Sequence, residues 1–168
     1  MNKPTAIVYT TKTGHTRQYA EILAKKTGLK AYSLDEAAKT LAKGSEIIYL
    51  GWIYASNIKG FSRAAKRFKV FAVCGVGLCD TGTLLDEVRA KTKIPAEIPL
   101  FTIQGGIDGT KLKGMDKMLI SMLIKGLENT KEPTETDKHM LELMKNNVNY
   151  VSESNLAEFL EYYGENFS

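Results

Sequence analysis

The sequence predicts an α/β fold, in which a five-stranded parallel sheet is covered by helices on both faces. Apolar runs of strand length alternate with longer segments in which apolar residues recur at helical spacing. Two of the runs, 47–50 and 70–74, are apolar throughout, which is typical of parallel strands buried on both faces. A chain of 168 residues, 43% of them hydrophobic, fits one domain over 1–168 with its own core.

A threonine-rich loop lies between the first strand and the first helix. Residues 5–10 predict a strand, and a helix is expected from about 16 to 27, with Gly28 as its stop. The loop 11–16 puts backbone N–H groups and three threonine hydroxyls at the positive end of the helix dipole, which favours bound phosphate. The alternative is an ordinary polar turn in which Thr16 caps the helix.

The second strand and the second helix follow directly. Residues 29–33 predict the strand, and Ser33 with Glu36 predicts a capping box at the start of the helix. Gly44 is expected to end this helix. Its expected buried stripe consists of Leu34, Ala37, Ala38 and Leu41.

The third strand, 47–50, leads into a loop at 51–57 that contains the only tryptophan of the chain. A third helix follows, and it includes a basic cluster formed by Arg63, Lys66, Arg67 and Lys69. The fourth strand, 70–74, leads into a glycine-rich loop at 75–82. The next helix is expected to turn Leu84, Leu85 and Val88 toward the core. The fifth strand is expected at 98–103.

A long segment separates the fifth strand from the last helix, which is expected at 155–163. The intervening residues, about 107–150, are too many for a plain loop and are expected to form a mostly helical insertion, with a second short helix near 136–146. The apolar face of its first helix consists of Met115, Met118, Leu119, Met122, Leu123 and Leu127. Either this helix packs on the sheet edge, or it is an apolar lid or a membrane-surface helix. In the second case, residues 107–127 would contact the membrane, with Lys111, Lys113 and Lys117 facing anionic headgroups.

The composition narrows the class of protein. We expect a cytoplasmic protein, because no secretory signal precedes the first strand and the two cysteines make no disulfide framework. No apolar run approaches the ~18 residues that span a bilayer. The net charge of +4 comes without exposed stacking aromatics or a known nucleic-acid module, so no nucleic-acid partner is expected. The scattered histidines and cysteines predict no metal site.

The loop after the first strand carries a resemblance to a known family. Thr11-x-Thr13-Gly14-x-Thr16 resembles T-x-T-G-x-T, the phosphate-loop pattern of flavodoxins. The aromatic loop after the third strand and the glycine-rich loops after the fourth and fifth strands lie where that family holds its flavin. The resemblance implies a flavodoxin-like doubly wound sheet with strand order 2-1-3-4-5, a helical insertion before the last helix, and FMN as the cofactor.

The resemblance also implies which residues bind the cofactor. The first loop would hold the phosphate through Thr11, Lys12, Thr13, Gly14, His15 and Thr16. The aromatic loop would contact the isoalloxazine ring through Trp52, Ile53, Tyr54, Ala55, Ser56 and Asn57. The far edge of the ring would be covered by Gly75, Val76, Gly77, Leu78, Cys79 and Asp80. Either Trp52 or Tyr54 would stack on the ring, and the alternative for Trp52 is a packed core position. No catalytic side chain is implied, because a flavin supplies its own redox chemistry.

The insertion carries a narrower resemblance. Gly105-Gly106-x-Asp108 and the run Met115-Asp116-Lys117-Met118 resemble the flavodoxin-like menaquinone-dependent protoporphyrinogen dehydrogenases of heme biosynthesis. Three functions follow as hypotheses. The first is an FMN oxidoreductase or electron carrier whose partner is a redox protein or a quinone. The second is oxidation of protoporphyrinogen IX by menaquinone, with peripheral contact at the inner face of the membrane. The third is an interaction module without flavin.

Overall fold

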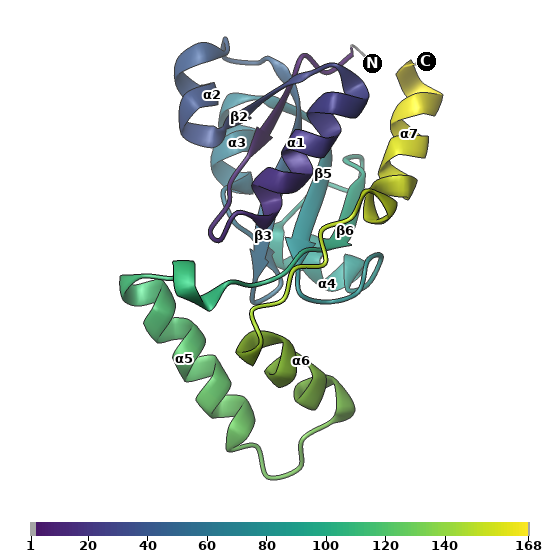
Figure 1. Cartoon of the computed structure of the whole chain (residues 1–168). Helices are drawn as coiled ribbons and strands as arrows, with labels where there is room; N and C mark the ends of the chain where they lie inside the picture. Colours follow the sequence, from purple (N-terminus) through teal and green to yellow (C-terminus); the bar gives the residue numbers. More distant parts are fainter. Residues whose placement is uncertain (1–2, 168) are drawn as a thin grey trace.

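A computed structural model describes residues 3–167, which form a parallel sheet between two layers of helices (Figure 1). The parallel strands are β1 (Ala6–Tyr9), β2 (Lys30–Ser33), β3 (Glu46–Tyr54), β5 (Lys69–Gly77) and β6 (Leu100–Gln104). Their spatial order is β2-β1-β3-β5-β6, and the short β4 (Asn57–Ile58) pairs antiparallel with the end of β3. The predicted fold class and the predicted order of the five parallel strands are therefore confirmed.

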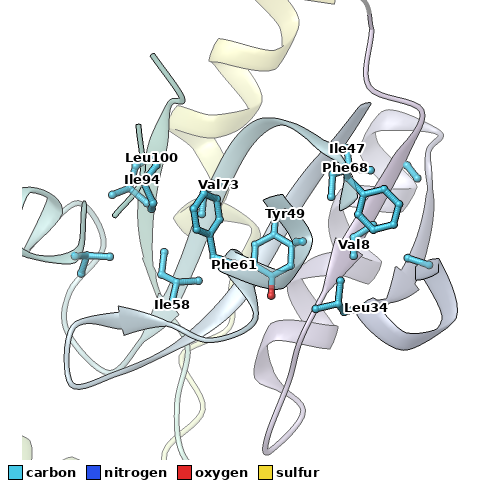
Figure 2. Packing of buried hydrophobic residues seen from close by; sticks show 14 residues of the cluster. Val8, Leu34, Ile47, Tyr49, Ile58, Phe61, Phe68, Val73, Ile94 and Leu100 are labelled. Atoms are coloured by element: carbon cyan, nitrogen blue, oxygen red, sulfur yellow. The ribbon is translucent and has the colours of Figure 1, made fainter. Parts of the chain in front are cut away.

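One face of the sheet is covered by α2 (Leu34–Thr40), α3 (Phe61–Arg67) and α4 (Leu85–Thr92). Figure 2 shows the core on this face, where Tyr49 of β3 lies between Phe61 of α3 and Leu34 of α2. The rings of Tyr49 and Phe61 meet edge to face, with centroids 6.2 Å apart. This layer covers one side of the central strands.

The opposite face is covered by α1 (His15–Thr27) and α7 (Ala157–Phe167), and the 3₁₀ turn η2 (Glu153–Leu156) precedes α7. Tyr19 of α1 is fully buried here, and its hydroxyl donates a hydrogen bond to the carbonyl oxygen of Gln104 in β6. The same hydroxyl accepts one from Nδ2 of Asn155 at 2.8 Å. One side chain thus connects α1, β6 and the start of the last helix.

The insertion extends beyond the carboxyl ends of the strands, on the side away from both chain termini (Figure 1). It contains the 3₁₀ turn η1 (Gly109–Lys111) and two helices, α5 (Gly114–Glu128) and α6 (Glu135–Lys145). Two helices were expected, but α5 packs against α6 rather than on the sheet edge, and none of its residues is buried. Among the described residues, no helix is both long and apolar enough to cross a membrane.

Strands β3 and β5 are longer than the sequence predicted. Residues 51–54 continue β3 instead of forming a loop, because Trp52 pairs with Val76 of β5 and Ile53 pairs with Ile58 of β4. Residues 75–77 continue β5 and pair with β6 in the same way. The loops predicted at 51–57 and 75–82 are therefore shorter in the structure. A tight turn at Ala55 and Ser56 joins β3 to β4.

The helix ends agree only in part with the prediction. The capping box of Ser33 and the stop at Gly28 are confirmed. Helix α2 ends at Thr40, before Gly44, because Leu41 is already extended. The core face expected for α4 is wrong at two positions. Leu84 and Leu85 are 48% and 37% exposed, since they lie at the start of the helix, and Val88 one turn later is fully buried.

The buried hydroxyl of Tyr49 gives a test of the packing around β3. It donates to the carbonyl oxygen of Lys59 at 2.7 Å and lies 3.1 Å from Oγ1 of Thr10. We expect Tyr49→Phe to lower the free energy of unfolding by about 1–2 kcal/mol, because two part-buried polar groups, the Thr10 hydroxyl and the Lys59 carbonyl, lose a partner. Chemical denaturation measures this change, and Tyr32→Phe on the half-buried Tyr32 of β2 is the control. Equal stabilities of wild type and Tyr49→Phe would contradict the assigned role.

Candidate functional site

A cavity of about 450 Å³ opens at the carboxyl edge of the sheet. Its walls come from the loop after β1, the β3–β4 turn, the end of β5, β6 and the insertion. This volume lies in the range of about 300–1,000 Å³ that is typical of small-molecule and cofactor sites. The position is the one where parallel α/β sheets bind ligands, beyond the carboxyl ends of their strands.

The loop after β1 forms one end of the cavity. Oγ1 of Thr11 accepts a hydrogen bond from the backbone N–H of Gly14 at 3.1 Å. Gly14 is the N-cap of α1 with a φ of 101°, a conformation that L side chains rarely adopt. No side chain caps α1, and Thr16 lies inside the first turn, so the alternative of a Thr16-capped turn is wrong. The N–H groups of this turn have no side-chain cap and are suited to an anion.

His15 lies in the floor of this loop and is only 7% exposed. Its Nδ1 is 2.9 Å from Oγ1 of Thr13. Burial lowers the pKa of His15, the charge of Lys111 lowers it further, and Asp108 opposes them. The imidazole is therefore neutral at neutral pH, and positive charge near the loop comes from lysines.

Gly106 holds the base of the insertion against this loop. It forms an antiparallel bridge with Asn149, so the two ends of the insertion lie side by side. A Cβ at Gly106 would lie 2.1 Å from the carbonyl oxygen of Val148 and 2.9 Å from Nε2 of His15. Only glycine fits at this contact without displacing the backbone.

Two lysines connect the insertion to the same loop. Nζ of Lys12 lies 2.5 Å from Oδ2 of Asp116 in α5. Nζ of Lys111 donates to the carbonyl oxygen of Thr13 at 3.4 Å and lies 3.6 Å from Asp108. An anion in the loop would therefore compete with Asp116 for Lys12.

The β3–β4 turn and the end of β5 form a second wall. Trp52 and Tyr54 line the cavity with their rings edge to face, 6.1 Å apart. Trp52 is half-buried in this wall, so its alternative assignment as a packed core residue is wrong. The turn itself is strained, because Ala55 and Ser56 both have positive φ angles, 47° and 60°. A hydrogen bond from the Ser56 hydroxyl to the carboxylate of Glu87 in α4 secures it.

Most of the residues expected at the site line this one cavity, and three do not. Those that line it are Thr11, Lys12, Thr13, His15, Thr16, Trp52, Ile53, Tyr54, Ala55, Ser56, Val76, Gly77, Leu78, Cys79 and Asp80. Asn57 instead turns to α4, where its Nδ2 donates to the carbonyl oxygen of Lys91 at 3.1 Å. Gly75 lies within β5 and packs against Ile53 and Ile58, and Gly14 contributes its backbone conformation.

The sequence predicted the roof of the cavity only in part. An apolar lid was one alternative for the insertion, with Leu119 and Leu123 on its apolar face, but the other roof residues were not expected there. Six apolar residues of the insertion form this roof: Leu112, Leu119, Ile120, Leu123, Met140 and Met144. Helical periodicity had singled out Leu119 and Leu123 as apolar, yet nothing in the pattern indicated which surface they would face. Thr102 and Ile103 of β6 were missed as well, because they lie within the predicted fifth strand.

Cys79 is a half-buried free thiol in the cavity wall. Burial raises the pKa of the Cys79 thiol, and Asp80 and Glu87 raise it further. The thiol is therefore protonated at neutral pH and is a weak nucleophile. Within residues 3–167, no group of three His, Cys, Asp or Glu side chains is placed to hold a metal ion.

A family model described as a flavodoxin domain matches residues 6–137. The match includes all five parallel strands, the loop at 11–16 and α5. Neither the curated proteins nor the solved structures yield a match to this chain.

The ionisation of His15 tests the electrostatics of the loop. Its pKa in the free protein is expected below 6.5, the ordinary value for histidine, because burial disfavours the charged ring. Inorganic phosphate bound in the loop should raise this pKa, since an anion stabilises the imidazolium. The lowered pKa also means that stability falls as the pH drops through and below about 6.5, where the unfolded chain binds more protons. NMR titration of the ring protons measures both values. A pKa at or above 6.5 without phosphate would contradict this assignment.

Proposed function

Because the chain belongs to the flavodoxin domain family, we propose that it binds FMN in this cavity and acts as an electron-transfer flavoprotein. One observation carries the proposal. At one end of the cavity a threonine-rich loop begins α1 with no side-chain cap, and the other walls of the cavity are aromatic and apolar. A flavin mononucleotide has the same division, with a phosphate at one end and a planar, largely apolar ring at the other. The residues present therefore fit this cofactor.

In this proposal, the phosphate is held at the start of α1. Thr11, Thr13 and Thr16 line this end of the cavity, and hydroxyls and backbone N–H groups are suited to an anion. Gly14 permits the left-handed turn that leads into the helix. Lys111, next to the loop, adds positive charge without forming part of the helix.

Trp52, Tyr54 and Val76 form the wall against which the ring would lie. Aromatic and aliphatic side chains favour a flat apolar ring and exclude water from it. When bound, FMN supplies one-electron and two-electron transfer. The chain's own residues set position and environment, and the protonated thiol of Cys79 takes no covalent part.

For the acceptor, we propose a small apolar molecule of the quinone class. The support is the roof formed by Leu119, Ile120 and Met140, which presents no charge to an incoming molecule. The one acidic side chain of α5 in the lining is Asp116, and it is paired with Lys12. A redox partner protein is the other candidate.

The separation of phosphate and ring contacts gives a direct test of the binding mode. Thr13→Ala should weaken FMN binding about 10- to 100-fold, because hydrogen bonds to charged groups contribute about 1.5–3 kcal/mol. Riboflavin, which lacks the phosphate, should bind the variant and the wild type equally. Thr27→Ala, at the other end of α1, is the matched control. Equal losses for FMN and riboflavin would contradict a phosphate site in this loop.

The acceptor is tested by reoxidation of the dithionite-reduced, FMN-loaded protein. A water-soluble menaquinone analogue should reoxidise it faster than dioxygen alone does. Leu119→Asp should slow reoxidation by the quinone about tenfold or more, because a charge then replaces an apolar contact. Protoporphyrinogen IX as the electron donor tests the narrower activity. An unchanged quinone rate in Leu119→Asp would contradict the proposed acceptor site, and FMN binding measured beside it separates this failure from loss of the cofactor.

A further inference from the structure

Helix α5 presents two different apolar surfaces. Leu119 and Ile120 line the cavity. Met115, Met118 and Met122 recur at spacings of three and four residues, so they share one side of the helix. Their exposed fractions are 71%, 53% and 61%, which makes this methionine stripe the most exposed large apolar surface among the described residues.

The charges of α5 are strongly asymmetric. Its two acidic side chains, Asp116 and Glu128, are ion-paired with Lys12 and Lys145. Lys113, just before the helix, and Lys117 and Lys125 within it are exposed and belong to no ion pair among residues 3–167. Uncompensated positive charge therefore lies beside the methionine stripe.

We propose that α5 lies on the surface of an anionic membrane, with the methionine stripe inserted among the headgroups and these lysines in contact with lipid phosphates. An amphipathic helix with lysines beside an apolar stripe binds in the plane of such an interface. A helix of 15 residues is about 22 Å long. It lies at the end of the molecule remote from both termini (Figure 1), and although α6 packs against it, its methionine stripe is exposed.

The charge pattern favours a lipid surface over a protein partner or a second copy of the chain. Lipid phosphates accept lysines without a fixed geometry, and unbranched methionine side chains adapt to a fluid surface. A second copy would bring two sets of uncompensated lysines into one interface with no free acidic side chains of α5 to pair with them, which is unfavourable. The inference concerns binding to the membrane and does not depend on the bound cofactor.

Vesicle flotation with the full chain tests the proposal. Wild type should bind phosphatidylcholine vesicles that contain phosphatidylglycerol, and binding to pure phosphatidylcholine or at high salt should be much weaker. Lys117→Gln with Lys125→Gln should weaken binding about 30-fold, at about one kcal/mol per lysine near the surface. Lys66→Gln with Lys69→Gln removes the same charge from the cluster beside α3 and should change binding less than about threefold.

The apolar contribution is tested by a second pair of variants. Met118→Ser with Met122→Ser should weaken vesicle binding at least about tenfold, and Met118→Leu with Met122→Leu should retain it. Both pairs lie on the surface, so circular dichroism should show unchanged folding. The proposal is overturned if wild type does not bind the anionic vesicles or if both lysine pairs have equal effects. It is also overturned if the variant with both serines binds vesicles like wild type. A wild-type chain that forms a dimer through these methionines and does not bind vesicles would overturn it as well.

Discussion

The fold depends on the burial of its central strands on both faces. Ile7, Ile48 and Ala72 pack on one helical layer, and their neighbours Val8, Tyr49 and Val73 pack on the other. Helices must therefore lie on both sides of the sheet, and each parallel crossover returns the chain to the same edge. The loops after β1, β3, β5 and β6 meet at the opposite edge, where the cavity lies. The position of the site is thus a consequence of how the core is buried.

The base of the insertion lies at this same edge of the sheet, in contact with the loop that begins α1. Gly106 and Asn149 join its two ends directly above His15, and Lys12 and Lys111 connect it to the loop that begins α1. The proposed phosphate site, the roof of the cavity and the proposed membrane surface are therefore parts of one connected unit. The Lys12–Asp116 ion pair joins α5 to the loop at the start of α1.

Local patterns were sufficient for the fold class and the threonine loop, because burial on both faces and the start of a helix can be recognised within short segments. The strand order followed only from the resemblance to flavodoxins, because no local pattern records which strands lie side by side. The sequence was insufficient where pairing between segments far apart in the chain decides how far a strand extends. Glycine at 51 and 75 indicated loops, yet both positions lie inside strands, where the hairpin packs so closely that a side chain would collide with Ile58. An apolar lid was one alternative for the insertion, but helical periodicity could not decide which apolar residues of α5 face the cavity and which face solvent. That the expected residues bind a cofactor stays a prediction.

The most direct test of the central claim is titration of the purified chain with FMN, followed by the visible spectrum and the flavin fluorescence. The account predicts saturable binding of one FMN per chain, with perturbed flavin bands near ~375 and ~450 nm and fluorescence quenched by Trp52 or Tyr54. A folded chain that leaves the FMN spectrum and fluorescence unchanged at every concentration would contradict the flavin site and would favour an interaction module on the same fold.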